Sequence, residues 1–273
     1  MTTADLETWG ISHAQGARMP PTVRVLRYHF YTYMRTWRSS LTTSFLAPVL
    51  YLAAMGVSLG HLINHHVGSV QGVPYLTFVA PGLLAASAMQ VAASDSMYPV
   101  MAAIKWIRTY YAMLATPLRV FDVLLGHFAW VTVRLVLTAV TYLGVMAAFG
   151  TVRSALAVVA LPAAILTGLS FSSVISAFAA SQENDQGFAQ VSRLGLIPLF
   201  LLSATFFPLS QLPGWMHPIA YATPLYHGVH LCRMAALGQM DWASAGWDFA
   251  YLIGLSIVGA VLAKRLFARR LVV

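Results

Sequence analysis

Charged residues are scarce in this chain. Only 9% of its 273 residues are charged and 59% are hydrophobic, whereas a soluble domain carries roughly 25% charged residues. The mean hydropathy is +0.71. This shortage of charge excludes an ordinary soluble protein and indicates an integral membrane protein. The single cysteine, Cys232, excludes an intramolecular disulfide.

Lysine is rarer still, and the lysine motif that binds nucleotide phosphates is missing. Lys105 precedes Trp106 and Lys264 precedes Arg265, so neither lies in the pattern G-x-x-x-x-G-K-[S/T]. Any use of ATP must therefore involve another polypeptide, which would hold the ATP and its Mg²⁺. We expect this chain to bind no cofactor and to have no catalytic residues.

Histidines gather in two loops, but cysteines and nearby acidic residues that would complete a metal site are few. His61 and His65 have the helical i, i+4 spacing of a chelating pair. Interfacial histidines are the simpler explanation of both groups, so we expect no metal. The two groups are His61, His65 and His66, and His217, His227 and His230.

Six apolar segments are long enough to cross a membrane as helices of about twenty residues. The sequence therefore predicts an all-α polytopic membrane protein with a six-span domain over residues 41–270. The predicted spans are residues 41–61, 75–97, 120–149, 155–180, 190–209 and 247–268.

Basic residues are distributed unevenly between the two sides that these spans define. Thirteen fall in the N-terminal part, the second and fourth loops and the C-terminal tail, whereas only Arg153 and Arg233 fall on the opposite side. Since basic residues concentrate on the cytoplasmic side, both termini should be cytoplasmic and the protein should lie in the plasma membrane. We expect residues 1–21 to form a cytoplasmic tail. The net charge of +8 therefore does not indicate nucleic-acid binding.

An amphipathic helix is predicted at residues 22–40, immediately before the first span. Helical spacing places its arginines on one arc and its apolar and aromatic residues, Trp37 among them, on an adjacent arc. Such a helix lies in the cytoplasmic headgroup layer, either as a simple anchor or also touching a cytoplasmic partner. The arginines are Arg24, Arg27, Arg35 and Arg38.

Two charges fall within predicted spans, where charges are costly and often functional. Arg134 lies inside the third span, and Asp95 lies near the cytoplasmic end of the second. We hypothesise that the two side chains are in contact. The alternative is that Arg134 reaches the inner membrane surface alone.

Residues 206–233 are apolar and aromatic, yet prolines prevent them from forming one straight helix. The prolines are Pro208, Pro213, Pro218 and Pro224, and Arg233 is the only formal charge. The segment lies between the fifth and sixth spans, so it should be external. We predict a pair of short helices, broken at the prolines, that re-enter the outer leaflet, because broken backbone is tolerated there when protein covers it.

This order of elements resembles the ABC-2 type permease family, the membrane subunits of a class of ABC exporters. The resemblance covers residues 22–270, and the subgroup it points to is that of lipo-oligosaccharide exporter permeases of the nodulation-factor type. The stretches that carry it are FLAPVLYLAAMGVSLG at 45–60, YLTFVAPGLLAASAMQ at 75–90, KWIRTYYAMLATPLRVFDVLLGH at 105–127 and FFPLSQLPGWMHPIAYATPLYHGVHLCR at 206–233.

The resemblance implies two permease subunits, as a homodimer or with a related permease, and two copies of a separate ATP-binding subunit. The loop at 98–119 resembles the family's coupling helix, although a plain basic loop remains the alternative. The residues expected to contact the ATP-binding subunit are Trp106, Arg108, Tyr110, Leu114 and Arg119, with Glu183 and Asp185 from the next cytoplasmic loop.

The resemblance also implies that residues 206–233 cap a translocation path for an amphipathic or lipid-linked cargo. An aromatic belt without cargo contact is the alternative. Multidrug efflux is the rival function within the family, while an ion-coupled transporter would normally need inverted repeats and buried acidic residues, which we do not find. The candidate gate residues are Phe206, Phe207, Pro208, Pro213, Trp215, Pro218 and Tyr221.

Overall fold

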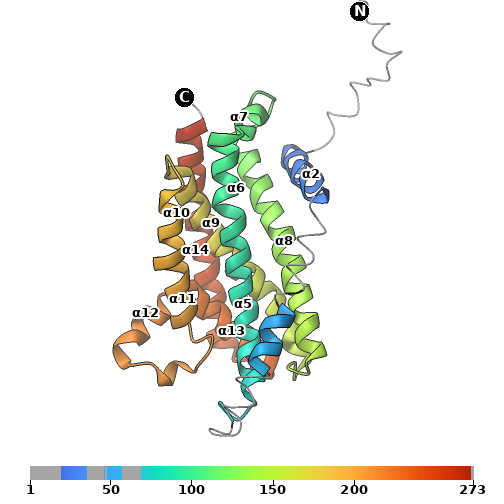
Figure 1. The fold of residues 1–273 in the computed structure, drawn as a ribbon, viewed down its shortest axis with the longest axis vertical. Helices are drawn as coiled ribbons and strands as arrows, with labels where there is room; N and C mark the ends of the chain where they lie inside the picture. Colours follow the sequence, from blue (N-terminus) through green and yellow to red (C-terminus); the bar gives the residue numbers. More distant parts are fainter. Residues whose placement is uncertain (1–19, 36–45, 47, 57–68, 272–273) are drawn as a thin grey trace, which may run out of the picture.

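The computed structural model describes residues 20–35, 46, 48–56 and 69–271. Within these ranges the chain is helical, and its only β pairing is an isolated bridge between Val70 and Val73. The long helices run side by side as a bundle (Figure 1). The all-α prediction is therefore confirmed for the part of the chain that the structure describes.

Four continuous helical stretches are long and apolar enough to cross a membrane. They correspond to the second, third, fourth and sixth predicted spans. The first joins α5 (Tyr75–Ser96), α6 (Tyr98–Met101) and a π-helical stretch (Ala102–Trp106); the others are α8 (Val120–Ala148), α9 (Ala160–Ser181) with its preceding 3-10 turn (Ala155–Val159), and α14 (Trp242–Leu271).

The predicted first and fifth spans are not among these four. About half of residues 41–61 lie outside the described residues, and 48–53 are α-helical. The fifth is the short helix Gln186–Leu202, which at about 1.5 Å per residue is about 25 Å long, whereas the hydrocarbon core is about 30 Å thick. The prediction that this helix continues to residue 209 is wrong.

The early end of this helix coincides with a change in backbone conformation at Ala204. The helix consists of α10 (Gln186–Gln190), a π-helical stretch (Val191–Leu196) and α11 (Ile197–Leu202). The Ser203 hydroxyl donates to the Leu199 carbonyl at 2.5 Å, and Ala204 then adopts a left-handed φ of +54°. The apolar pattern did not reveal this end, because Phe206 and Phe207 continue the apolar run.

The centre of the bundle is α9, which packs against α5, α8, α13 (Pro224–Leu237) and α14. Small residues allow these close contacts. A Cβ atom on Gly228 would lie 2.1 Å from Thr167 Oγ1, and one on Gly259 would lie 2.2 Å from Ser173 Oγ and 2.9 Å from the Val174 backbone nitrogen. The backbones of α13 and α14 therefore approach α9 too closely for any side chain at these two positions.

Gly259→Ala should destabilise the protein, because the new methyl group would push α14 away from the α9 backbone. We expect a loss of about 1–3 kcal/mol of folding free energy, measured as a lower unfolding midpoint of the purified protein. Gly254→Ala is the matched control, since Gly254 lies in the same helix and has open space at its Cβ position. Equal midpoints for the two variants would contradict this packing.

The amphipathic helix predicted at 22–40 is present as α2 (Pro21–Met34), and it packs against α8. Arg35 follows its end, whereas Trp37 and Arg38 lie outside the described residues. The docking residue is Val25, which is buried, and a Cβ atom on Gly126 of α8 would lie 2.4 Å from it. The His29 ring also stacks on Trp130 at 5.9 Å. The sequence predicted an amphipathic helix at the membrane interface, but it did not predict the contact with α8 through Val25.

Candidate functional site

One end of the bundle joins three segments that are far apart in sequence. The Lys105 ammonium donates to the Glu183 carbonyl at 2.5 Å, and the Arg270 guanidinium donates to the carbonyls of Ala180 and Gln182. The Tyr111 hydroxyl donates in turn to the Arg270 carbonyl at 2.9 Å. Figure 1 shows α7 (Thr109–Leu114), the start of α10 and the C-terminus at this same end. We refer to this region as the basic end.

The basic end exposes large apolar side chains among its cations. Trp106 is 53% exposed and Ile107 is 73% exposed. Next to them, Arg108 has a left-handed φ of +60° and starts α7. Apolar side chains exposed in one place among polar residues are typical of a protein interaction surface. Two cavities of about 500 and 490 Å³ open at this end, and they share Lys105 and Arg270 in their walls.

Two of the predicted contact residues are less exposed than their neighbours at this surface. Tyr110 is only 2% exposed, because α7 turns its ring inward onto Phe267 of α14, at 5.9 Å between ring centroids. Leu114 is partly buried against the core. The prediction is corrected for Tyr110, whose buried ring holds α7 in place, whereas Leu114 remains a predicted contact residue. Ile107, which the sequence analysis did not select, is more exposed than either.

The other predicted contact residues lie at the surface. Glu183 and Asp185 are exposed in the loop before α10. Arg119 is exposed as well, and its backbone N–H donates to the Asp122 carboxylate at 2.9 Å, which caps the start of α8. This cap gives Arg119 a structural role in addition to the predicted one.

The structure brings the two predicted intramembrane charges together. Arg134 Nε donates to Asp95 Oδ2 at 3.1 Å, and both side chains are largely buried. The Arg134 guanidinium also lies 5.3 Å from the centre of the Tyr33 ring. The arginine therefore connects α5, α8 and the amphipathic helix α2, and it does not reach away from the bundle alone.

At the opposite end, the prolines start helical turns as well as interrupting them. Pro208 and Pro213 precede the 3-10 turns Leu209–Gln211 and Gly214–Met216, and Pro218 lies at the start of α12 (His217–Tyr221). The last proline begins α13, which continues to Leu237. The predicted pair of short helices is thus two 3-10 turns, one short helix and one longer helix that extends past residue 233.

The candidate gate residues are divided between the interior and the surface of this segment. Phe206 packs edge-on against Phe200 at 4.9 Å, and Pro208 is buried. Phe207 is partly buried, whereas the remaining four are exposed. The exposed four are Pro213, Trp215, Pro218 and Tyr221.

A carboxylate shared by two histidines ties α13 to α14. Asp248 Oδ1 lies 2.6 Å from His227 Nδ1, and Asp248 Oδ2 lies 2.7 Å from His230 Nδ1. The Tyr251 ring stacks on His227 at 4.1 Å. The spacing of these histidines indicated only interfacial residues, because nothing in it identifies an acidic partner eighteen or more residues away.

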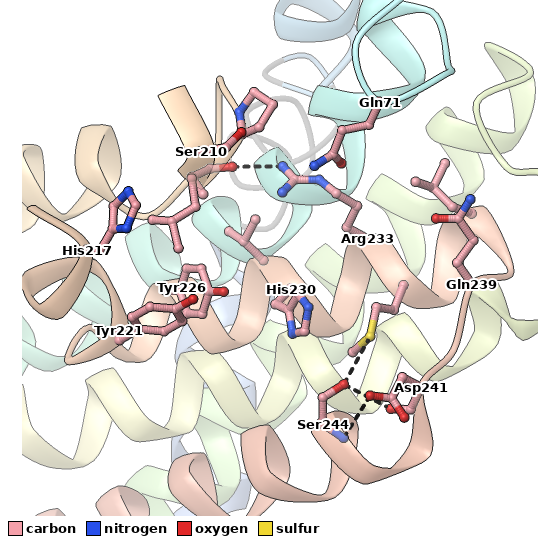
Figure 2. A pocket seen from close by; sticks show the side chains of 16 residues that line it. Gln71, Ser210, His217, Tyr221, Tyr226, His230, Arg233, Gln239, Asp241 and Ser244 are labelled. Carbon is pink, nitrogen blue, oxygen red and sulfur yellow. Dashed lines mark hydrogen bonds between the residues drawn. The ribbon is translucent and has the colours of Figure 1, made fainter. Parts of the chain in front are cut away.

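Beside this cluster lies a cavity of about 600 Å³, which we call the Arg233 pocket (Figure 2). Its walls come from the loop before α5, the segment 204–221, α13 and the residues that lead into α14. The residues labelled in Figure 2 are Gln71, Ser210, His217, Tyr221, Tyr226, His230, Arg233, Gln239, Asp241 and Ser244.

Comparison with known proteins agrees with this architecture. Residues 22–237 match the family described as ABC-2 type transporter. Nodulation protein J of Rhizobium meliloti (strain 1021) is 30% identical over 250 residues, which cover 91% of this chain and 93% of that protein. Nodulation protein J of Rhizobium leguminosarum bv. viciae is 35% identical over 219 residues, covering 79% and 82%.

A more distant relative has a different name. The inner membrane transport permease YadH of Escherichia coli (strain K12) is 22% identical over 211 residues, which cover 77% of this chain and 80% of that protein. The family match covers most of the chain, and the two nodulation protein J relatives are similar over 93% and 82% of their length. The chain therefore belongs to the ABC-2 type transporter family, as a membrane-embedded permease of the nodulation protein J type.

Proposed function

We propose that this permease is the membrane subunit of an ATP-driven exporter. Its cargo is an amphipathic or lipid-linked molecule, such as a glycolipid, a lipo-oligosaccharide or a polysaccharide precursor, taken from the cytoplasm or the inner leaflet. The observation that carries the proposal is the basic end, where exposed Trp106 and Ile107 lie beside segments held together by Lys105 and Arg270. Such a surface suits the binding of a partner subunit whose conformational change drives transport.

The partner is an ATP-binding subunit, in two copies, that holds ATP and Mg²⁺. The chain's two lysines lie outside any phosphate-binding loop, so the nucleotide chemistry belongs to the partner. The basic end then faces the cytoplasm together with both termini, in agreement with its excess of lysine and arginine.

A second permease copy completes the path, either identical or related. Helix α14 has an apolar face that the described part of the chain leaves uncovered, and this face suits lipid or a second copy. Its exposed residues include Ile253, Ile257, Val258, Val261 and Leu262.

A movement at the basic end can be transmitted to the bundle through continuous helical segments and one ion pair. The π-helical stretch Ala102–Trp106 continues directly from α6, which follows α5, and π-helical segments are frequent at functional sites. Asp95, near the end of α5, then connects to Arg134 of α8. We infer that closure of the ATP-binding subunits shifts α5 and α8 together and biases the bundle between two arrangements.

The cargo assignment rests on the aromatic segment at the other end and on the resemblance to lipo-oligosaccharide exporters. Trp215 and Tyr221 are exposed there, and aromatic side chains favour the membrane interface. Sugar rings can stack on such faces while acyl chains remain in lipid.

Candidate glycolipids should stimulate the ATPase activity of the purified permease–ATPase complex, whereas hydrophobic drugs should not. Phe207→Ala and Trp215→Ala should each lower this stimulation and the export rate several-fold at unchanged protein levels, because the cargo loses its stacking surface. Phe149→Ala is the control, because Phe149 is an exposed aromatic residue outside both the gate segment and the cavity beside it. Unchanged export by both gate variants would contradict the gate, and stimulation by drugs alone would contradict the cargo class.

A further inference from the structure

The Arg233 pocket contains an arginine that has no acidic partner. Arg233 Nε donates to the Phe78 carbonyl at 3.2 Å, and Nη2 donates to the carbonyls of Ala204 and Thr205 at 2.8 and 3.3 Å. No carboxylate among the described residues forms an ion pair with this guanidinium, and Nη1 makes no hydrogen bond with them. A partly buried cation with spare N–H groups favours an anionic ligand.

The backbone around Arg233 fixes the position of its guanidinium. The group lies over the Phe78 ring at 3.8 Å. A Cβ atom on Gly82 would lie 3.1 Å from the Thr205 carbonyl oxygen and 3.3 Å from Arg233 Nη2, so glycine leaves the space in which this contact forms. Ala204, whose carbonyl accepts from Nη2, has a left-handed φ of +54°. Strained backbone of this kind is frequent at ligand sites.

The carboxylates near the pocket are engaged elsewhere. Asp241, which lines it, accepts hydrogen bonds from the backbone N–H groups of Ala243 and Ser244 at 3.2 and 3.3 Å. The Ser244 side chain and these N–H groups hold the pKa of Asp241 below its usual range. Asp248 is shared by His227 and His230. Neither carboxylate therefore neutralises Arg233.

The rest of the pocket wall suits a hydroxylated headgroup. Hydrogen-bonding side chains lie around the cavity, and His230 uses Nδ1 for Asp248, which leaves Nε2 for a ligand. The rings of Tyr221 and Tyr226 meet edge-to-face at 4.9 Å in the same wall. The other polar residues are Gln71, Ser210, His217, Gln239 and Ser244 (Figure 2).

Exposed tryptophans lie near the pocket on the segments that form it. Trp215, Trp242 and Trp247 are 68%, 67% and 70% exposed, and they flank His217, Ser244 and Asp248 in sequence. Tryptophan is enriched at the level of lipid headgroups. These exposed tryptophans suit a pocket that opens at the level of lipid headgroups.

We propose that the Arg233 pocket binds the oxyanion-bearing headgroup of a lipid, such as a phosphate with attached hydroxyl groups. Arg233 Nη1 donates to the oxyanion, and the amide and hydroxyl side chains of the wall bind the hydroxyl groups. Because Arg233 also holds Ala204 and Thr205, an occupied pocket stabilises the link between α11 and α13. This binding does not require export, so it can be tested on the permease without its ATPase.

The test uses the purified full-length permease in detergent and measures its unfolding midpoint during lipid titration. Phosphatidylglycerol should raise the midpoint saturably, whereas phosphatidylcholine and inorganic phosphate should have at least tenfold weaker effects. Arg233→Gln should weaken the phosphatidylglycerol response at least tenfold. Arg153→Gln is the matched control, because Arg153 is an exposed arginine that lies outside the pocket.

Arg233 also binds the backbone carbonyls of Ala204 and Thr205, so its substitution can prevent folding. In that case the Gln239→Ala variant tests whether the pocket binds the lipid. Gln239 lines the pocket, and its loss should weaken the response several-fold in a folded protein. The proposal is overturned if phosphatidylglycerol and phosphatidylcholine act alike, if inorganic phosphate alone matches the lipid, or if Arg153→Gln weakens the response as much as the pocket variants do.

Discussion

Asp95→Ala is expected to lower the free energy of unfolding by about 3 kcal/mol, because it leaves the Arg134 guanidinium largely buried without its partner. The same variant should uncouple ATP hydrolysis from export, since the ion pair joins α5 to α8. The unfolding midpoint of the purified permease measures the first effect, and transport per ATP hydrolysed by the reconstituted complex measures the second.

The charge-swapped double variant, Asp95→Arg with Arg134→Asp, distinguishes the contribution of the ion pair to stability from the contributions of the two individual side chains. It should recover part of the stability that either single substitution removes. Asp185→Ala serves as the control, because this carboxylate is exposed and forms no ion pair among the described residues. A swap that is no more stable than the single variants would show that the contact contributes nothing as a pair.

Ile107→Asp is expected to abolish association with the ATP-binding subunit and to reduce export by at least a hundredfold. Ile107 is 73% exposed beside Trp106, and an aspartate there would place an unpaired charge in the interface core, where one well-placed side chain contributes about 2 kcal/mol or more. Co-purification of the two subunits and export in cells measure the effect.

Leu156→Asp introduces the same charge at the other end of the bundle, where Leu156 is also exposed. It should leave subunit association intact. The conservative Ile107→Val should retain association as well. If the Ile107→Asp variant still associates normally with the ATP-binding subunit, the partner does not bind at the basic end.

Helices whose pattern is long and uniform could be predicted from sequence. Residues 120–149 and 247–268 both form helices, α8 and α14, since a long apolar run in a chain with few charges has few other solutions. Helix α8 ends one residue before the predicted bound, whereas α14 begins five residues earlier and ends three residues later than predicted. The Asp95–Arg134 contact could also be predicted from the sequence, because buried charges in spans require partners.

The parts that could not be predicted depend on contacts between segments. Val25 of α2 packs against Gly126 of α8. The apolar pattern of a single helix predicts that one of its faces is covered, but it does not identify the helix that covers that face. Tyr110 was selected as a surface residue, yet it packs on Phe267, far away in sequence. The arginine of the Arg233 pocket looked like a loop charge, and only the fold brings the carbonyls of Phe78 and Ala204 to it.

Transport by the purified permease in lipid vesicles tests the account's central claim most directly. The experiment compares the chain alone, supplied with ATP or with a proton or sodium gradient, with the chain joined to its ATP-binding subunit. The account predicts that the chain alone neither hydrolyses ATP nor accumulates a glycolipid cargo, and that the complex does both. Uphill transport by the chain alone, driven by an ion gradient, would contradict the claim that its energy comes from a separate ATPase.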